Sequence, residues 1–82
     1  MKVIGTYQPP QAARPLEVIE PIEGQLEVYT EWRGTRTLVL SITPNDHEVW
    51  GPGWSDNPPE WLSAIRDGAT ALYREVKANE LD

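Results

Sequence analysis

Only one stretch of this chain has the length and the apolar spacing that a helix of several turns needs, and it lies near the C-terminal end. The apolar residues that recur three or four positions apart are Trp61, Leu62, Ile65, Ala69, Leu72 and Val76. This spacing is typical of a helix with one apolar face. The sequence therefore predicts one amphipathic helix over residues 57–78, with its helical turns running from Pro58 to about Ala78.

The start of this helix is marked by Asn57-Pro58-Pro59-Glu60. Asn is a preferred N-cap residue, and Pro is tolerated in the first turn, where its missing N–H is not needed. A Glu three residues after the cap can bond back to the cap N–H. We expect Asn57 to cap the helix.

Residues 16–51 are cut by prolines and glycines into short segments with alternating apolar side chains, which predicts a β-meander. In the clearest strand, residues 25–33, one face is expected to hold Leu26, Val28, Thr30 and Trp32, and the other Glu27, Tyr29, Glu31 and Arg33. The next strand covers residues 37–43, and a short third strand covers residues 47–51.

The expected register pairs Trp32 with Leu38 and Val28 with Ile42, across a three-residue loop at 34–36. We expect Val49 beside Ile42 on the core face and Trp50 on the opposite face. Side chains alternate along a strand, so a slip of one residue would exchange the two faces. The strand residues expected in the core are Leu26, Val28, Trp32, Leu38, Leu40, Ile42 and Val49.

Residues 1–15 are expected to be a short strand at 2–7 followed by an extended arm, because Pro9 and Pro10 fix φ and remove backbone donors. Residues 16–22 end at Pro21 and are expected to form an edge strand. The predicted fold is a single α+β domain, in which a three- to four-stranded antiparallel β-meander carries one C-terminal amphipathic helix on one face.

The chain of 82 residues is acidic, with 13 Asp and Glu against 7 Lys and Arg and a net charge of −6. Such a surface repels phosphate backbones and attracts basic protein surfaces, so nucleic acid is not the expected partner. No apolar run is long enough to span a membrane, and no signal peptide or cysteine is present. We expect a cytoplasmic protein without a membrane partner.

Catalysis is not expected. The chain has one His, no Cys and no glycine-rich phosphate loop, and its serines lie outside any nucleophile motif. Asp46, His47 and Glu48 are adjacent at a turn, where their side chains diverge and cannot all reach one ion. The sequence therefore predicts no enzyme, no cofactor and no metal site.

The expected function is protein binding. The residues predicted to contact a partner are Glu27, Tyr29, Glu31, Trp50 and Trp54. Aromatic residues are enriched at binding hot spots, and a row of glutamates would favour a basic partner surface. Glu17, Glu20 and Glu23 precede this row. An inhibitor or antitoxin-like protein of a phage or mobile element fits these features.

Two alternatives remain open at this stage. Unpaired strand edges would allow a homodimer that extends the sheet, and thus a self-assembling structural or accessory protein. Arg33 and Arg36, at the tip of a hairpin, would instead allow weak nucleic-acid binding.

Overall fold

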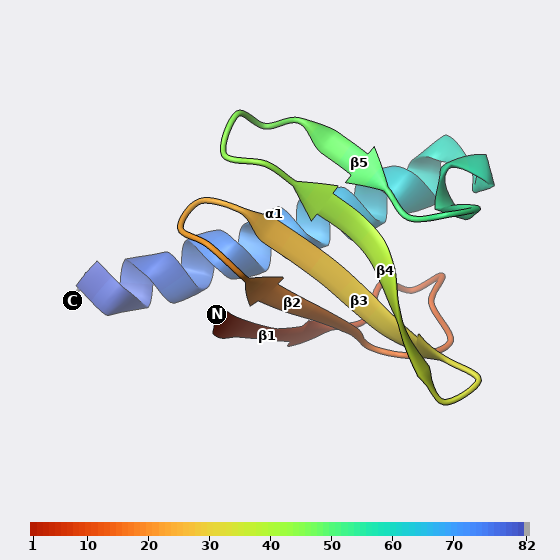
Figure 1. Ribbon diagram of the computed structural model, residues 1–82, viewed down its shortest axis with the longest axis horizontal. Coiled ribbons are helices and arrows are strands. Elements are labelled where there is room, and N and C mark those ends of the chain that lie inside the picture. Colours follow the sequence, from red (N-terminus) through yellow and green to blue (C-terminus); the bar gives the residue numbers. More distant parts are fainter. Residues whose placement is uncertain (82) are drawn as a thin grey trace.

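The computed structural model describes residues 1–81, which form one antiparallel sheet with a long helix on one face (Figure 1). The elements in chain order are β1 (Lys2–Tyr7), β2 (Leu16–Glu20), β3 (Leu26–Trp32), β4 (Thr35–Ile42), β5 (Glu48–Trp50), a 3₁₀ turn η1 (Trp54–Asp56) and α1 (Pro59–Leu81). The strands lie in the sheet in their sequence order. The α+β class and the meander are confirmed, whereas the sheet has five strands instead of three or four.

The strand expected at residues 2–7 is β1, and it joins the sheet as a fifth strand by pairing with β2 around an irregularity at Ile4. The Tyr7 hydroxyl donates a hydrogen bond to the backbone carbonyl of Ile65, 2.5 Å away, and so fastens β1 to the helix. The run that ends at Pro21 is consequently an internal strand, β2, and not the edge strand that we expected. Pro21 lies one residue beyond β2 and removes no hydrogen bond from it.

The helix α1 begins one residue later and ends three residues later than the sequence predicts. The expected cap is not formed in the described chain, since no N–H of α1 donates to the side-chain oxygen of Asn57. The side-chain amide nitrogen of Asn57 donates to the carbonyl of Trp54, at 2.9 Å. The apolar stripe is confirmed at its centre, where Ile65 and Ala69 are fully buried. Gly68 lies against the Tyr7 ring, so a Cβ at this position would overlap the ring atoms.

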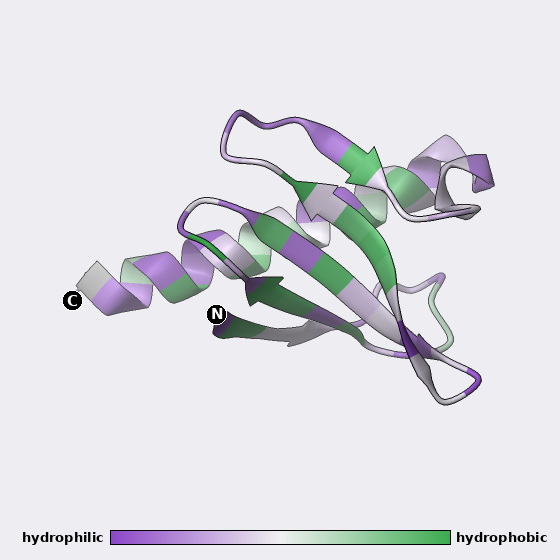
Figure 2. Cartoon of the chain, viewed as in Figure 1, coloured by the Kyte–Doolittle hydropathy of each residue, from purple (hydrophilic) through white to green (hydrophobic). Residues whose placement is uncertain are grey.

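The core lies between the sheet and α1. Its buried residues are Ile4, Leu16, Val18, Leu26, Val28, Val39, Leu40, Ile65 and Ala69. Figure 2 shows apolar residues concentrated in the middle of the strands and polar residues at the turns. Leu26, Val28 and Leu40 are therefore confirmed as core residues, and Ile42 packs against them while remaining partly exposed.

The β3–β4 hairpin differs from the expected register. Arg33 and Gly34 alone form the turn, with φ values of 51° and 77°, and Trp32 stands opposite Thr35. Positive φ at both central positions gives a turn whose twist matches that of the two strands. The prediction of a three-residue loop was therefore wrong. Trp32, expected in the core, extends beyond the covered part of the sheet and is 63% exposed.

A β-bulge in β4 restores the burial that this tighter turn would otherwise disrupt. Val28 stands opposite Leu40 and Tyr29 opposite Leu38, which leaves Val39 as the extra residue. Two successive residues of a bulge can point to the same side of a sheet. Val39 and Leu40 are accordingly both buried in the core, and Leu38, which was expected there, faces away from the helix beside Tyr29.

The register of β5 also differs by one residue from the prediction. Val49 pairs with Ser41 and Trp50 pairs with Leu40. The turn before β5 is one residue shorter than the expected register requires, because the N–H of Thr43 bonds the carbonyl of His47 and leaves only residues 44–46 in the turn, where Asp46 adopts a positive φ of 61°. Val49 is therefore 49% exposed on the open face, and Trp50 packs against the core.

Candidate functional site

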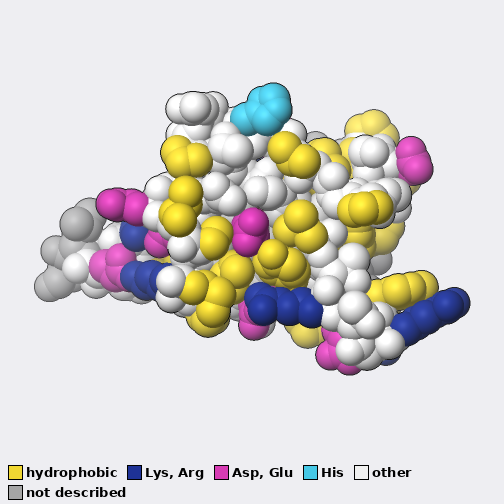
Figure 3. Space-filling model, in the orientation of Figure 1, with side chains coloured by type: hydrophobic (Ala, Val, Ile, Leu, Met, Phe, Trp, Pro, Cys, Tyr) yellow, Lys and Arg dark blue, Asp and Glu magenta, His cyan; other side chains and the backbone are white. Residues whose placement is uncertain are grey.

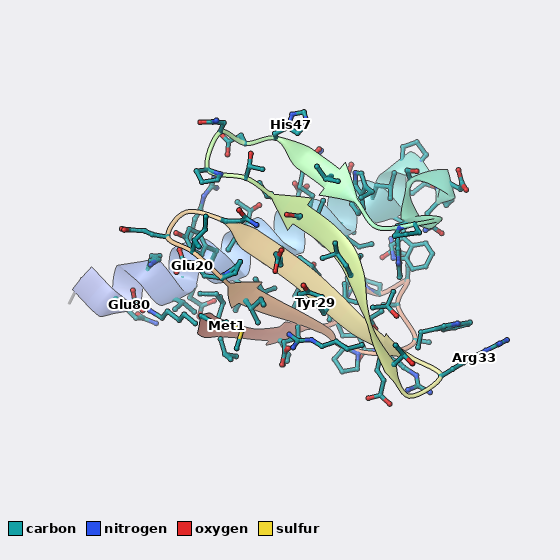
Figure 4. All side chains as sticks on the ribbon, viewed as in Figure 1. Met1, Glu20, Tyr29, Arg33, His47 and Glu80 are labelled. Atoms are coloured by element: carbon teal, nitrogen blue, oxygen red, sulfur yellow. The ribbon has the colours of Figure 1, made fainter. Side chains whose placement is uncertain are left out.

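The sheet has one face without a helix, which we call the open face. The register places on it Val3 and Thr6 from β1, Glu17 and Ile19 from β2, Glu27, Tyr29 and Glu31 from β3, Arg36, Leu38 and Ser41 from β4, and Val49 from β5. Figure 4 shows Tyr29 in the middle of this face, on the side of the sheet turned away from α1. Three of the five predicted contact residues, Glu27, Tyr29 and Glu31, thus share the expected face.

Tyr29 is held by Glu27 on its own strand and by Arg36 on β4. Its hydroxyl donates to Oε1 of Glu27 at 3.1 Å. The guanidinium carbon of Arg36 lies 4.3 Å from the centre of its ring, and Nη2 of Arg36 lies 2.5 Å from Oε1 of Glu17. Burial, and then the bond to Glu27, raises the pKa of Tyr29 above its ordinary value. The ring is therefore held in one position, which lowers the entropy that a partner would have to remove on binding.

The glutamates expected on this face differ in whether a Lys or Arg side chain forms an ion pair with them. Glu17 is paired with Arg36. Glu20 points to the helix side, where it is buried and bound to Lys77 at 3.1 Å, so it does not belong to the acidic surface that we expected. Glu27 and Glu31 have no ion pair with any of the residues that the structure describes. The expected row of glutamates is therefore reduced to two uncompensated charges beside Tyr29.

The open face also carries apolar side chains. Val3 is 59% exposed, Val49 is half-exposed and Leu38 is partly exposed. Ile19 is buried, although it is not part of the core beneath α1, and its register partners are Val3 and Glu27. Figure 3 shows hydrophobic side chains grouped over the middle of this side of the molecule, with charged groups among them and around the margin. An aromatic and apolar centre with a charged margin resembles the composition of protein-binding surfaces.

The two tryptophans predicted to join this surface lie elsewhere. Trp50 faces the helix, because the register of β5 is shifted by one residue. Trp54 lies in η1 and packs edge-to-face against Trp61, with ring centres 5.8 Å apart and an interplanar angle of 70°. The structure therefore separates both tryptophans from Tyr29, with which the sequence groups them as predicted partner contacts.

Trp54 and Trp61 instead line a cavity of about 450 Å³ near the start of α1, together with Trp32. We call it the tryptophan cavity. Its volume lies within the range of small-ligand sites. The sequence reasoning assigned Trp61 to the helix stripe and Trp32 to the core. The sequence gives no signal for the cavity, because only the packing of α1 on the sheet brings Trp32 near Trp54 and Trp61.

The remaining chemistry of the chain is sparse. Within residues 1–81, no group of three or more Asp, Glu or His side chains is arranged to hold a metal ion. His47 is exposed at the β4–β5 turn (Figure 4). Arg36, one of the two arginines considered for nucleic-acid binding, is occupied by Glu17 and Tyr29, whereas Arg33 projects from the hairpin tip beside Trp32.

Comparison with protein-family models, with curated proteins and with solved structures gave no match. Among the described residues, the single long helix α1 is too polar to cross a membrane.

Proposed function

We propose that this protein is a non-enzymatic binding module that holds a basic surface of another protein against its open face. The observation that carries the proposal is the juxtaposition of a fixed Tyr29 with two carboxylates, Glu27 and Glu31, that lack cationic partners. The aromatic ring and the exposed Val3 and Val49 provide the contact area.

The charge of the chain favours a basic partner. The net charge is −6, and acidic and basic surfaces steer each other into contact before short-range interactions form. A basic partner would complete the ion pairs that Glu27 and Glu31 lack. A protein of this kind would act as an inhibitor or antitoxin-like protein by covering the basic surface of its partner.

The test is affinity purification from a host lysate with three versions of the chain. The first is the natural sequence, and the second is the double variant Glu27→Gln and Glu31→Gln. The third, a matched control, is Glu60→Gln with Glu75→Gln, which removes the same charge from exposed helix positions. The proposal expects a captured protein that the first double variant loses and the control retains.

The size of the effect follows from the strength of exposed ion pairs. If each pair contributes about 0.2–1 kcal/mol, losing two weakens binding roughly two- to thirtyfold. High salt should release the captured protein, because exposed charges are screened over about 8–10 Å near physiological ionic strength. Equal capture by both double variants, or capture indifferent to salt, would overturn the proposal.

A second candidate function, a homodimer through strand edges, has one structural feature in its favour. The outer edge of β1 has no neighbouring strand in the described chain, and it is six residues long. The irregularity at Ile4 bends this edge, which is a common means of preventing sheet extension. Sedimentation at high protein concentration distinguishes the two functions, because the binding module remains a monomer and the accessory protein does not.

A further inference from the structure

The β3–β4 hairpin extends beyond the end of its neighbour β2. The last pair between β2 and β3 joins Glu17 to Tyr29, yet β3 continues to Trp32. If the same register continued, Pro15 would stand opposite Glu31. Proline has no N–H to donate, so the ladder stops at this point. The end of β3 is left with an edge that no strand covers.

The backbone of Glu31 faces this uncovered edge. In a hairpin with a two-residue turn, the residues that flank the turn form the closing hydrogen-bonded pair, here Trp32 and Thr35. Successive residues in an antiparallel ladder direct their N–H and C=O groups to opposite sides. The N–H and C=O of Glu31 therefore point away from β4, and no backbone hydrogen bond joins them to residues 8–15 in the described chain.

A cavity lies on each side of the same edge. The tryptophan cavity is on the helix side. A second cavity of about 500 Å³ is on the open-face side, lined among others by Glu17, Tyr29 and Arg36. Arg14, Thr30 and Glu31 line both cavities. The two cavities thus flank the stretch of β3 that β2 leaves uncovered.

We infer that this edge binds an extended segment of a protein partner as a short additional strand. Side chains of a strand point alternately to its two faces, so neighbouring residues of the segment would enter the two cavities in turn. Recognition of this kind combines main-chain hydrogen bonds for affinity with pockets for alternate side chains. The segment would place an apolar residue among the tryptophans and a basic residue on the other side.

The preference for a basic residue rests on Glu31 and on the net charge of −6, with Arg14 as the opposing charge in the lining of the same cavity. On the open-face side, Arg36 is already neutralised by Glu17, whereas the exposed carboxylate of Glu31 has no ion pair among the described residues. A Lys or Arg of the segment would pair with Glu31. This inference rests on the proposed function, because it takes from it that the bound partner is a protein with basic residues.

The tryptophan cavity has a further property that suits a peptide. The indole N–H of Trp61, which is among the residues that line it, is buried and has no hydrogen-bond acceptor in the described chain. Leaving a buried donor unpaired costs free energy, and an acceptor such as a peptide carbonyl would remove that cost. The faces of Trp32 and Trp54 would contact the apolar side chain of the segment.

The inference is tested with two pentapeptides of the same composition. One, Ac-Lys-Leu-Lys-Leu-Lys-NH₂, alternates charged and apolar residues as an added strand requires. The other, Ac-Lys-Lys-Leu-Leu-Lys-NH₂, has the same charge without alternation. Calorimetry gives the affinities, and amide hydrogen exchange of Glu31 gives a site-specific readout. We expect the alternating peptide to bind at least tenfold more tightly and to slow exchange at the Glu31 amide.

Two single variants locate the site. Trp32→Ala and Glu31→Gln alter exposed side chains, so both should fold, and each should weaken the alternating peptide at least threefold. Ile22→Ala, at an exposed apolar position beside the other end of β3, should leave peptide binding unchanged. Equal affinity for both peptides, or unchanged exchange at Glu31, would overturn the inference.

The outcome also separates this inference from the proposed function. If neither pentapeptide binds while lysate capture still depends on Glu27, the open face is the binding surface and strand addition is wrong. If the alternating peptide binds while capture ignores Glu27→Gln, strand addition stands and the open-face proposal fails. Binding of penta-proline in preference to the alternating peptide would show a polyproline groove and would also overturn strand addition.

Discussion

The hydroxyl of Tyr73 in α1 donates a hydrogen bond to Oε2 of Glu20 in β2, at 2.8 Å, and so joins the helix to the sheet through a buried carboxylate. Only 5% of the Glu20 side chain is exposed. The N–H of Gly24 donates to the same oxygen at 3.0 Å, and Lys77 lies 3.1 Å from the other one. A buried charge is tolerated only when it is paired and hydrogen-bonded, and the Glu20 carboxylate is both.

The first prediction concerns the replacement Glu20→Gln. Glutamine keeps the shape of the side chain but loses the charge, and hydrogen bonds to charged groups contribute about 1.5–3 kcal/mol. We expect the free energy of unfolding to fall by an amount in this range, measured by urea unfolding at neutral pH. The control Glu23→Gln removes a charge from an exposed position in the same turn and should change stability by less than about 0.5 kcal/mol.

The second prediction concerns acid pH. The N–H of Gly24, together with Tyr73 and Lys77, holds the pKa of Glu20 below its ordinary value despite burial. A carboxyl with a depressed folded-state pKa contributes stability above its unfolded pKa of about 4.3 and loses it as pH falls through the folded value. The stability difference between the natural chain and Glu20→Gln should therefore shrink below about pH 4. A difference that stays constant down to pH 2 would contradict this account.

The third prediction concerns alkaline pH and the three tyrosines. Burial raises the pKa of Tyr7 far above its ordinary value, burial raises that of Tyr29, and the bond to Glu20 raises that of Tyr73. A raised folded-state pKa contributes stability that is fully present below the unfolded pKa of about 10 and is lost as pH rises above it. Near-ultraviolet absorbance should show little tyrosinate in the native protein at pH 10 and substantial tyrosinate in denaturant.

The fourth prediction is that Gly68→Ala destabilises the protein, although Ala is the better helix former. The added Cβ would overlap the ring of Tyr7, which the hydrogen bond to Ile65 holds in place. Overpacking of a core costs about 1–3 kcal/mol, which exceeds the gain of about 1 kcal/mol from helix propensity. Ala71→Gly, at an exposed helix position, measures the difference in helix propensity between Ala and Gly without any change in core packing. A higher melting temperature for Gly68→Ala would contradict the close approach of β1 to α1.

The fifth prediction isolates the backbone cost at the β3–β4 turn. Gly34 has a φ of 77°, and a Cβ there would meet no atom within 4 Å. Gly34→Ala should therefore destabilise the protein only through the left-handed conformation, by about 1–2 kcal/mol. Gly34→Asn should cost less, because Asn tolerates that region more readily. Urea unfolding of both variants makes the comparison, and equal costs would argue for a different turn.

Part of the candidate site could be predicted from the sequence because it depends on alternation alone. Tyr29 lies on the opposite side of β3 from Val28 in any register, so Glu27, Tyr29 and Glu31 were assigned to the open face correctly. Trp50 was assigned to the wrong face, because the side of the sheet that it faces depends on how many residues the β4–β5 turn uses. The edge at Glu31 was also missed, because it exists only where Pro15 fails to continue the neighbouring strand.

The local pattern of the sequence determined the identity of the elements. The spacing around Ile65 and Ala69 specifies a helix, and the alternation in β3 specifies a strand, because these periods are properties of a single segment. Only the tertiary structure decided the strand register. The bulge at Val39 lets two consecutive residues reach the core, and Leu40 and Trp50 then share the helix side. Burial against α1 selects that arrangement, because neighbouring registers have similar local energies and differ mainly in which side chains leave water.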